Sequence, residues 1–584
     1  MKSFALFSFL NNREAKAKLI FFVIIFISIL VVFLDAFSIF TILPIISMIT
    51  DTVDLQDKFS HLRFFPETLL SFIEHLDYKS IFLILILILL CRNLIYIFYQ
   101  YLVFRFVKYL EVDTYKKLFF LLINKDYLNF YNQTSNELIK NFQTSVIQYL
   151  SYSEMIARII SDTSILFLYL LFLFYISPKE TLFIFLYFSI IFLILRKILS
   201  NFSFRYGKTY NSTASSLNLT ILNTFKNFSQ IILRNLKKKY TTIFSEIIIK
   251  HSFSRLVINF VKTINRQFLE ISLLTLIIIA FYVLNKIYSV SEFVTLSTIY
   301  IAAAYRIMPV VNSLIASYVK LRNYEYGFNI ICNQMNSFNK KYKKIYFSTV
   351  KKDKYKFKKQ ISLKSINFKF NSAAIKTFSN LNLKINKNKM IGIIGESGAG
   401  KTTLIKILLG LIKPNSGKIL VDGKNLNYKK KENYYLLYSY LPQENLFIPG
   451  TIKENIAFGQ DNINTEKVLE VLKETNCMKF VKKLKKNINS EIIENGKNFS
   501  VGQLQRFALA RALYFESEIL ILDEPTSALD KNSENKFLKL IKKLKKKKTI
   551  IIISHKSTSL KDCDKVYKMS QNRLISTTIK HHSI

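Results

Sequence analysis

The sequence predicts two unlike halves, an α-helical membrane domain followed by an α/β domain built around a Gly-rich phosphate-binding loop. The chain has 584 residues, which is too long for one compact domain. Its first part carries long Phe, Ile and Leu runs with few charges, whereas its last part alternates short apolar strands with polar helices. We therefore predict a membrane domain over 1–336, a Lys-rich linker over 337–360 and the α/β domain over 361–584.

The membrane domain is predicted to cross the bilayer six times, because a helix needs about 20 apolar residues to span the hydrocarbon. Six stretches have that length: 19–46, 81–104, 159–177, 181–199, 266–284 and 293–318. The third and fourth are joined only by 177–180, and the fifth and sixth by 285–292. These short connections predict two tight hairpins.

Charge predicts the orientation, since Lys and Arg are held on the cytoplasmic side of a membrane. The segment 196–266 holds thirteen Lys and Arg against one acid, whereas 50–79 holds six acids against three bases. The first segment is therefore predicted to face the cytoplasm and the second to lie outside. Both termini and the α/β domain are then cytoplasmic. The apolar run near the N-terminus is too long for a signal-peptide core and is interpreted as an uncleaved membrane helix.

Three further segments of the membrane domain have recognisable patterns. The segments 105–158 and 200–265 have helical apolar spacing and few breakers, which predicts helices that continue far into the cytoplasm. The outer segment 64–76 fits a short amphipathic helix lying on the outer membrane surface. An ordinary covering loop fits this outer segment equally well.

Composition raises two function classes that we set aside. The formal charge is +44, but Lys, Ile, Asn, Phe and Tyr are all abundant, so the bias is general and predicts no nucleic-acid partner. The Lys runs are interpreted as solvated helix faces, some of which can meet anionic lipid. The four cysteines, Cys91, Cys332, Cys477 and Cys563, form no CxxC pair and indicate neither zinc nor a disulfide framework.

The segment 395–402 reads GESGAGKT, and the apolar run 391–394 before it is typical of a buried strand. A helix is predicted from Lys401 to Leu409. A strand, a Gly-rich loop and a helix in this order form a phosphate cradle, in which backbone amides bind the phosphates. Lys401 is expected to neutralise the outer two phosphates, and the Thr402 hydroxyl to ligate Mg²⁺. The predicted ATP contacts are Gly395, Glu396, Ser397, Gly398, Ala399, Gly400, Lys401, Thr402 and Thr403.

Other polar residues follow other predicted strands. Asp523 ends the apolar strand 519–522 and is predicted to reach the Mg²⁺ shell, while Glu524 is the candidate general base. His555 follows the strand 549–554, where a γ-phosphate contact is favoured over the usual surface or core role of a lone histidine. Gln443 is expected to touch both Mg²⁺ and the membrane domain. The predicted catalytic residues are thus Glu524, His555 and Gln443, and the predicted metal ligands Thr402, Gln443 and Asp523.

Phe370, in the stretch NFKF, is a candidate for stacking on adenine. The alternative is a core aromatic residue at the end of a strand.

These motifs, together with FSVGQ at 499–503 and SALD at 527–530, resemble the nucleotide-binding domain of ABC transporters. The membrane domain is similar to the exporter type of that family. In that family two domains face each other head to tail, and the signature of one completes the phosphate site of the other. The resemblance implies ATP and Mg²⁺ as cofactors, a homodimer, and ATP contacts from Ser500, Gly502 and Gln503. Val501 replaces a family glycine, which is expected to alter the close approach of the two backbones.

Three arginines lie inside predicted crossings, where charges are expensive and usually face a water-filled cavity. Arg92 and Arg306 are about 17 to 20 Å from the outer ends of their crossings, and Arg266 about 27 Å, at helical rise. This graded set of cations would suit an anionic head group, above all a phosphate. Alternatively, Glu270 and Asp35 could neutralise the arginines as ion pairs.

The stretches FLDAFS at 33–38, 124–138 and AYRIMPVVN at 304–312 resemble the bacterial lipid-linked oligosaccharide flippases of protein N-glycosylation. The resemblance implies that Arg92, Arg266 and Arg306 engage a pyrophosphate and that 64–76 engages a polyprenyl tail. It also implies a multi-pass protein of the bacterial inner membrane that moves an undecaprenyl-pyrophosphate-linked oligosaccharide from the cytoplasmic to the periplasmic leaflet. A general exporter of lipids, drugs or peptides is the alternative. A soluble-type ABC ATPase acting on nucleic acid or ribosomes is opposed by the six predicted spans.

Overall fold

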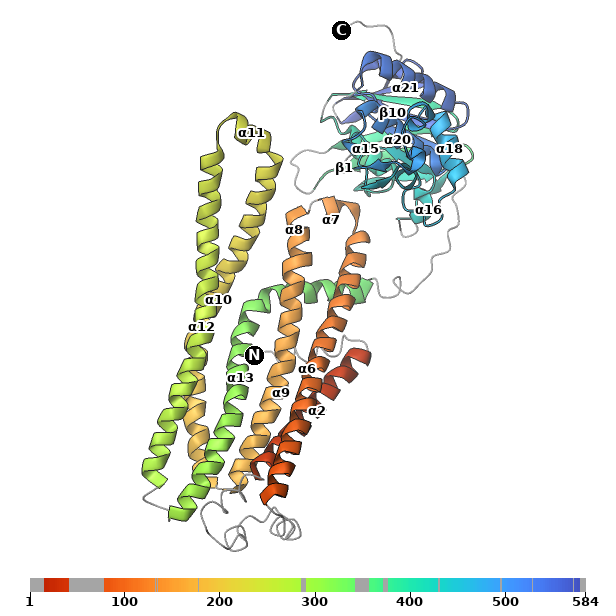
Figure 1. Cartoon of the computed structure of the whole chain (residues 1–584). Coiled ribbons are helices and arrows are strands. Elements are labelled where there is room, and N and C mark those ends of the chain that lie inside the picture. Colours follow the sequence, from red (N-terminus) through yellow and green to blue (C-terminus); the bar gives the residue numbers. More distant parts are fainter. Residues whose placement is uncertain are drawn as a thin grey trace. The chain divides into compact units, whose positions relative to one another are not determined.

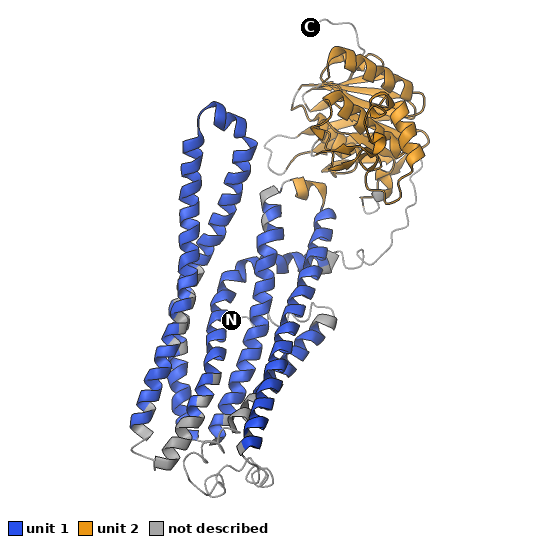
Figure 2. Ribbon diagram, in the orientation of Figure 1, with its two compact units in different colours: residues 1–125, 132–347 blue, residues 126–131, 348–584 orange. Residues whose placement is uncertain are grey.

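The computed structural model forms two compact units, coloured separately in Figure 2. The first unit contains Met1–Lys125 and Asn132–Phe347, and the second contains Asp126–Tyr131 and Ser348–Ile584. The short segment Asp126–Tyr131 thus belongs with the C-terminal half, although it lies early in the sequence. The structure describes residues 15–40, 78–131, 133, 135–176, 178–284, 290–341, 357–370, 377–396, 398–428, 431–493, 496–527, 529–570 and 572–577.

The first unit is built of long helices (Figure 1). They are α2 (Ala15–Phe40), α6 (Tyr78–Ile123), α8 (Ser135–Lys140), the π-helical turn η1 (Asn141–Ser145), α9 (Val146–Ile176), α10 (Pro178–Lys226), α11 (Phe228–Leu233), α12 (Lys237–Leu284) and α13 (Val290–Lys341). Helices α6, α10 and α12 continue well beyond the predicted crossings, as the apolar spacing predicts. Helix α13 ends at Lys341, so the helix runs past residue 337, where the linker is predicted to begin.

Within the described residues, three helical stretches are long and apolar enough to cross a membrane: Phe82–Ile123, Glu137–Tyr175 and Pro178–Leu195. They contain all but the first residue of the second predicted crossing and most of the third and fourth. Two shorter apolar stretches, Lys18–Leu34 and Glu270–Ile279, fall on the first and fifth. A total of six crossings stays a prediction. Residues 41–46 of the first crossing and the predicted outer helix 64–76 lie outside the described residues.

Helices α9 and α13 pack closely along one another. A Cβ atom at Gly327 of α13 would lie 2.2 Å from Oε1 of Gln148 on α9, so a larger residue there would push the helices apart. One residue further on, the ring of Phe328 stacks on Tyr152 with the ring centroids 4.0 Å apart. Gln148 also donates a hydrogen bond from Nε2 to Asn211 of α10 over 2.8 Å. These contacts tie three helices together.

The second unit is an α/β domain with three sheets. Its strands are β1 (Gln360–Phe368), β2 (Phe378–Asn386), β3 (Met390–Gly395), β4 (Ser416–Val421), β5 (Lys424–Asn425), β6 (Tyr438–Leu441), β7 (Gly450–Thr451), β8 (Glu491–Ile492), β9 (Ile519–Asp523), β10 (Thr549–Ser554), β11 (Lys565–Ser570) and β12 (Arg573–Thr577). Its helices are α7 (Tyr127–Tyr131), α15 (Lys401–Leu408), α16 (Glu432–Tyr435), α17 (Ile452–Ile456), α18 (Thr465–Glu474), α19 (Met478–Val481), η3 (Asn487–Asn489), α20 (Val501–Tyr514), α21 (Lys531–Leu544) and η5 (Ser557–Leu560).

The central sheet has the strand order β12-β11-β3-β10-β9-β6, and all its strands are parallel except β12. Alternate residues of its inner strands enter two different cores. Ile519, Ile521, Ile551 and Ile553 join the core on one face, and Leu520, Leu522, Ile550 and Ile552 join the core on the other. Burial on both faces explains why these strands are continuous apolar runs in the sequence.

The antiparallel sheet, in the order β2-β1-β4-β5, contains a tight hairpin at Asp422 and Gly423. Both residues have a positive φ, +47° and +85°, as a two-residue hairpin turn requires. The carboxylate of Asp422 accepts hydrogen bonds from the backbone amides of Lys358, Lys359 and Gln360 over 2.6 to 2.8 Å. The turn therefore anchors the segment that enters the domain.

We expect Asp422→Ala to destabilise the second unit by about 2 kcal/mol, because three hydrogen bonds are lost and alanine disfavours a positive φ. Thermal unfolding of the full chain in detergent, followed by circular dichroism, measures this loss. The control is Asp461→Ala at an exposed position. Equal melting of the two variants would contradict the anchoring role.

Candidate functional site

The predicted ATP residues meet at one edge of the central sheet, because four neighbouring parallel strands end there. Ser554 of β10 pairs with Ile394 of β3, directly before Gly395. On the other side of β10, Ile553 pairs with Asp523 of β9. The last pair of β9 with β6 is Leu522 and Leu441, two residues before Gln443. In α/β sheets, ligands bind outside the carboxyl ends of the strands, so this edge is the expected ligand site.

The Gly-rich loop after β3 closes around Lys401. This side chain is only 7% exposed and donates hydrogen bonds from Nζ to the carbonyl oxygens of Gly395 and Glu396, over 2.7 and 2.8 Å. Gly398 and Gly400 have φ of +82° and +97°, a conformation that glycine adopts without strain. The loop is thus curled around a buried ammonium group, as a phosphate cradle requires.

The remaining loop residues lie around this cradle. Ala399 is half-buried and its amide donates to the Glu396 carbonyl over 3.2 Å, while Thr402 is exposed and Thr403 half-buried in the first turn of α15. The positive end of the helix dipole therefore faces the cradle. Ser397 lies outside the described residues.

Asp523 is a buried carboxylate at the end of β9, only 3% exposed. Burial raises its pKa, and the nearby Glu524 raises it further. The hydroxyl of Tyr440, on the neighbouring strand β6, donates to its Oδ2 over 3.2 Å. An anion buried beside a second carboxylate is stabilised by a cation, so Asp523 fits the predicted role of metal ligand.

The other proposed ligands, the Thr402 hydroxyl and the Gln443 amide oxygen, are of the kind that hold Mg²⁺ next to nucleotide phosphates. Among the described residues there is no cluster of three or more His, Cys, Asp or Glu that could hold a metal ion alone. A cation at this edge would therefore depend on nucleotide oxygens as well as on the chain.

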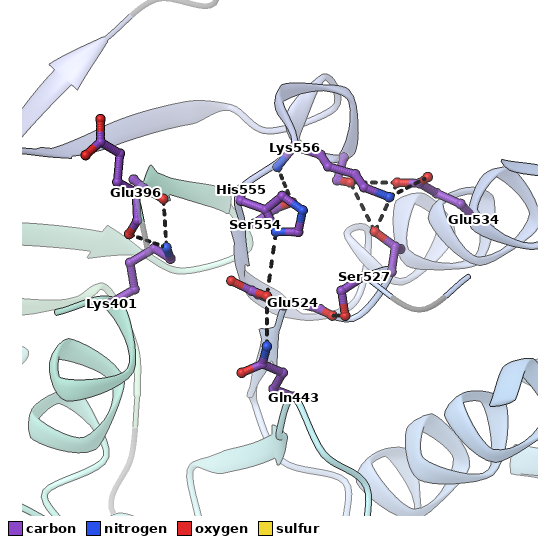
Figure 3. Close-up of polar contacts among 12 residues, drawn as sticks. Glu396, Lys401, Gln443, Glu524, Ser527, Glu534, Ser554, His555 and Lys556 are labelled. Atoms are coloured by element: carbon purple, nitrogen blue, oxygen red, sulfur yellow. Dashed lines mark hydrogen bonds and ion pairs between the residues drawn. The ribbon is translucent and has the colours of Figure 1, made fainter. Parts of the chain in front are cut away.

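Glu524 stands between two of the predicted catalytic residues (Figure 3). Gln443 donates from Nε2 to Oε2 of Glu524 over 3.0 Å, and Nδ1 of His555 lies 3.6 Å from the same oxygen. Glu524 has φ +48°, a left-handed conformation that is strained for a residue with a Cβ atom and is common at functional sites. Its amide is held by the Ile553 carbonyl of β10 over 2.9 Å. The three predicted catalytic residues are thus neighbours.

The signature segment forms the N-terminus of α20. Ser500 Oγ accepts from the amide of Gln503 over 3.3 Å, and Oε1 of Gln503 accepts from the amide of Ser500 over 2.9 Å. This reciprocal capping box leaves the helix start well formed although Val501 replaces a glycine. A Cβ atom at Gly502 would lie 3.3 Å from Leu529, within the SALD segment. Asp530 ends that segment and caps α21 by accepting from the Ser533 amide over 3.0 Å.

Phe370 follows β1 and is half-buried against the core of the domain. Its ring meets Phe368 edge-on, with the centroids 4.8 Å apart. This contact agrees with the alternative of a core aromatic residue, and adenine stacking stays a prediction.

Helix α7 is a part of this domain that sequence reasoning missed. Tyr127 and Leu128 pack against the core of the α/β domain. The ammonium group of Lys406, on the helix that follows the Gly-rich loop, lies 5.2 Å from the Tyr127 ring centroid and 4.3 Å from that of Tyr131. These are cation–π distances. The spacing of four residues between Tyr127 and Tyr131 indicates that both rings lie on one face of a helix. The local sequence does not indicate which domain this face contacts.

Tyr440 is the second missed residue. Burial raises its pKa, the adjacent Asp523 raises it further, and Tyr127 contributes in the same direction. The alternation of buried and half-buried residues in β6 can be expected from the sequence, but the sequence does not show that β6 lies beside β9, which carries Asp523.

Of the three predicted substrate arginines, Arg92 is described. It is half-buried in α6, donates from Nη1 to Asn93 over 2.9 Å, and lies 5.3 Å from the Tyr96 ring centroid. The side chains of Arg266 and Arg306 lie outside the described part of the chain.

Residues 378–527 match the ABC transporter family model. An export ATP-binding/permease protein of Rickettsia prowazekii is 39% identical over 217 residues, 37% of this chain and 38% of that protein. A leukotoxin translocation ATP-binding protein of Mannheimia glucosida is 34% identical over 229 residues, 38% of this chain and 32% of that protein. The chain therefore spans about a third of the length of the curated relatives it matches.

The likeness in structure is broader. A bacterial Atm1-family ABC exporter with ATP bound superposes with a TM-score of 0.72 and 17% identity, covering 94% of this chain and 93% of that one. At this identity the match concerns the fold. Residues 378–527 thus resemble the ATP-binding domain of ABC transporters, and the chain has the fold of an ABC exporter.

Proposed function

We propose that two copies of this chain form an ATP-hydrolysing exporter of the bacterial inner membrane. The observation that carries the proposal is the convergence of Gln443 and His555 on one oxygen of Glu524, beside the phosphate cradle. One chain carries one cradle and one signature. The positive end of the helix dipole at the N-terminus of α20 suits a phosphate of the opposite copy, and Val501 there is 53% exposed. Two copies would thus complete two sites.

In the proposed hydrolysis, the residues of the site have separate roles. Lys401 and the loop amides hold the β- and γ-phosphates, and Mg²⁺ would neutralise charge on the phosphate oxygens. Glu524 accepts a proton from the attacking water, while Gln443 holds the carboxylate in place by its hydrogen bond. His555 lies on the opposite side of the same carboxylate oxygen and can donate to the γ-phosphate.

We expect Glu524→Gln to lower ATP turnover by about 10²- to 10⁴-fold, since an amide cannot act as a general base. ATP binding should persist, so dimers with trapped nucleotide should accumulate. Phosphate release and size-exclusion chromatography of detergent-purified protein measure the two effects. The control is Glu466→Gln, an exposed position in the first turn of α18. Turnover within twofold of the unchanged chain, or hydrolysis by a strict monomer, would refute the assignment.

For the cargo, we propose an undecaprenyl-pyrophosphate-linked oligosaccharide, moved from the cytoplasmic to the periplasmic leaflet. The support is the set of arginines in the apolar spans. Arg92 lies in the stretch Phe82–Ile123, which is apolar enough to cross a membrane, and the residue is half-buried. Guanidinium groups pair with phosphate oxygens in two-point contacts, which makes them suited to a pyrophosphate.

A general exporter is the second candidate. It is favoured by the names of the two relatives, one an export permease and the other a leukotoxin translocator, and by the exporter fold. This function requires the same ATP chemistry but no cationic path through the membrane domain.

We expect Arg306→Ala to abolish transfer of a lipid-linked oligosaccharide across vesicle membranes while leaving basal ATP hydrolysis within about twofold. The reason is that the phosphate charge would lose a partner in a medium of low dielectric constant. The assay scores glycan that becomes accessible on the opposite leaflet.

The matched control is Arg205→Ala, an exposed arginine in the cytoplasmic extension of α10. Unchanged transfer in Arg306→Ala, together with ATP hydrolysis stimulated by many hydrophobic compounds, would favour the general exporter.

A further inference from the structure

Near the predicted catalytic residues, one buried carboxylate, that of Glu534, is surrounded by polar side chains. The proposed hydrolysis chemistry does not use this carboxylate. Glu534, in the first turn of α21, is 9% exposed. Its Oε1 accepts hydrogen bonds from the hydroxyls of Thr526 over 3.0 Å and Ser559 over 2.9 Å. Its Oε2 lies 3.6 Å from Nζ of Lys556 (Figure 3). Both oxygens of the carboxylate therefore have partners.

The partners come from two segments that each carry a catalytic residue. Thr526 lies two residues after Glu524, and Lys556 directly follows His555. Ser527, directly after Thr526, donates from its amide and its hydroxyl to the Glu524 carbonyl, over 3.2 and 3.1 Å. The Lys556 amide donates to Ser554 Oγ at the end of β10, over 2.9 Å. The segment that follows Glu524 and the segment that follows His555 are thus both bound to Glu534.

Packing alone does not explain a charged residue at this position. A carboxylate is costly to bury unless it is hydrogen-bonded and paired with a cation, and an apolar residue would fill the same space more favourably. Thr526 and Ser559 are themselves 1% and 3% exposed, and their hydroxyls, which lie 3.2 Å apart, both donate to Glu534. The three side chains form one satisfied polar unit, and such units specify a unique arrangement of the segments that they join.

We propose that Glu534 is a positioning residue that fixes His555 relative to Glu524. The inference rests on the proposed ATP hydrolysis, in which Glu524 accepts a proton from the water that attacks the γ-phosphate and His555 donates to that phosphate. Nδ1 of His555 lies 3.6 Å from Oε2 of Glu524. The two loops that carry these residues meet at Glu534, and the hydroxyls of Thr526 and Ser559, which both donate to Glu534, also lie 3.2 Å from each other. Releasing either loop from Glu534 allows the imidazole to move away from the carboxylate, while the Gly-rich loop on β3 stays intact.

The test uses the full chain with ATP and Mg²⁺. We expect Glu534→Gln to lower kcat about tenfold and Glu534→Ala about 100-fold, since small misplacements of reacting groups cost about 10²-fold. The KM for ATP should stay within about twofold, because Lys401 and the cradle are not touched. Loss of ATP binding in parallel with kcat would overturn the proposal.

A matched control separates positioning from stability. Asp564 is also a structural carboxylate of this domain, accepting from the Met390 amide and pairing with Lys545, both over 2.8 Å. It lies at the opposite end of β3 from the Gly-rich loop. Asp564→Asn should lower the melting temperature but leave kcat unchanged below the melting range. An equal kcat loss in Asp564→Asn and Glu534→Gln would show a general effect of instability and refute the proposal.

A double-mutant cycle identifies the route. If Glu534 acts through the Thr526 hydroxyl, the kcat losses of Glu534→Ala and Thr526→Val should be less than multiplicative. Hydrogen exchange of the peptides around residues 524–527 and 553–557 should rise in Glu534→Ala and not in Asp564→Asn. Multiplicative losses with unchanged exchange would contradict the proposal. A wild-type chain that does not hydrolyse ATP would instead refute the proposed function, which makes the two failures distinguishable.

Discussion

The site depends on the parallel alignment of four strands, β6, β9, β10 and β3. Their pairing places the chain segments that follow them at one edge of the sheet, although these segments are far apart in the sequence. Each inner strand is buried on both faces, so a register shift by one residue would turn core side chains to the wrong side. The hydrophobic cores thereby hold the predicted catalytic residues in register. Polar residues that directly follow these strands in the sequence therefore lie close together at this edge of the sheet.

The difference between local signals and strand order explains what could be predicted from the sequence. The predicted strand and helix around 391–409 and the predicted strand 549–554 agree with β3, α15 and β10, because apolar runs and Gly-rich turns are local signals. The meeting of Gln443, Glu524 and His555 follows from motif order. The bond from Tyr440 to Asp523 could not be predicted, since it requires knowing that β6 lies beside β9. Glu534 was missed for the same reason, because α21 reads as an amphipathic helix whose first turn is polar.

The least predictable feature is the membership of α7 in the ATP-binding domain. This short helix lies in the sequence between the long helices α6 and α9, yet its tyrosines surround Lys406 of α15. Lys406 is near enough to Asp523 to lower the pKa of that carboxyl against the opposing effect of burial. A displacement of α7 would therefore change both the packing of the helix after the Gly-rich loop and the charge around Asp523, the predicted metal ligand.

Val501 shows how a departure from a motif can be tolerated. Valine is a weaker helix former than most residues, yet it occupies the first turn, where the capping box of Ser500 and Gln503 already fixes the backbone. Its side chain is 53% exposed, so it strains nothing within the chain. The amides of Ser500 and Gln503 are engaged in the capping box, and the substitution at Val501 leaves the backbone donors of Val501 and Gly502 unchanged. In the proposed dimer, the consequence of Val501 would therefore fall on the second copy, whose phosphate cradle would approach an exposed branched side chain where a glycine would leave open space.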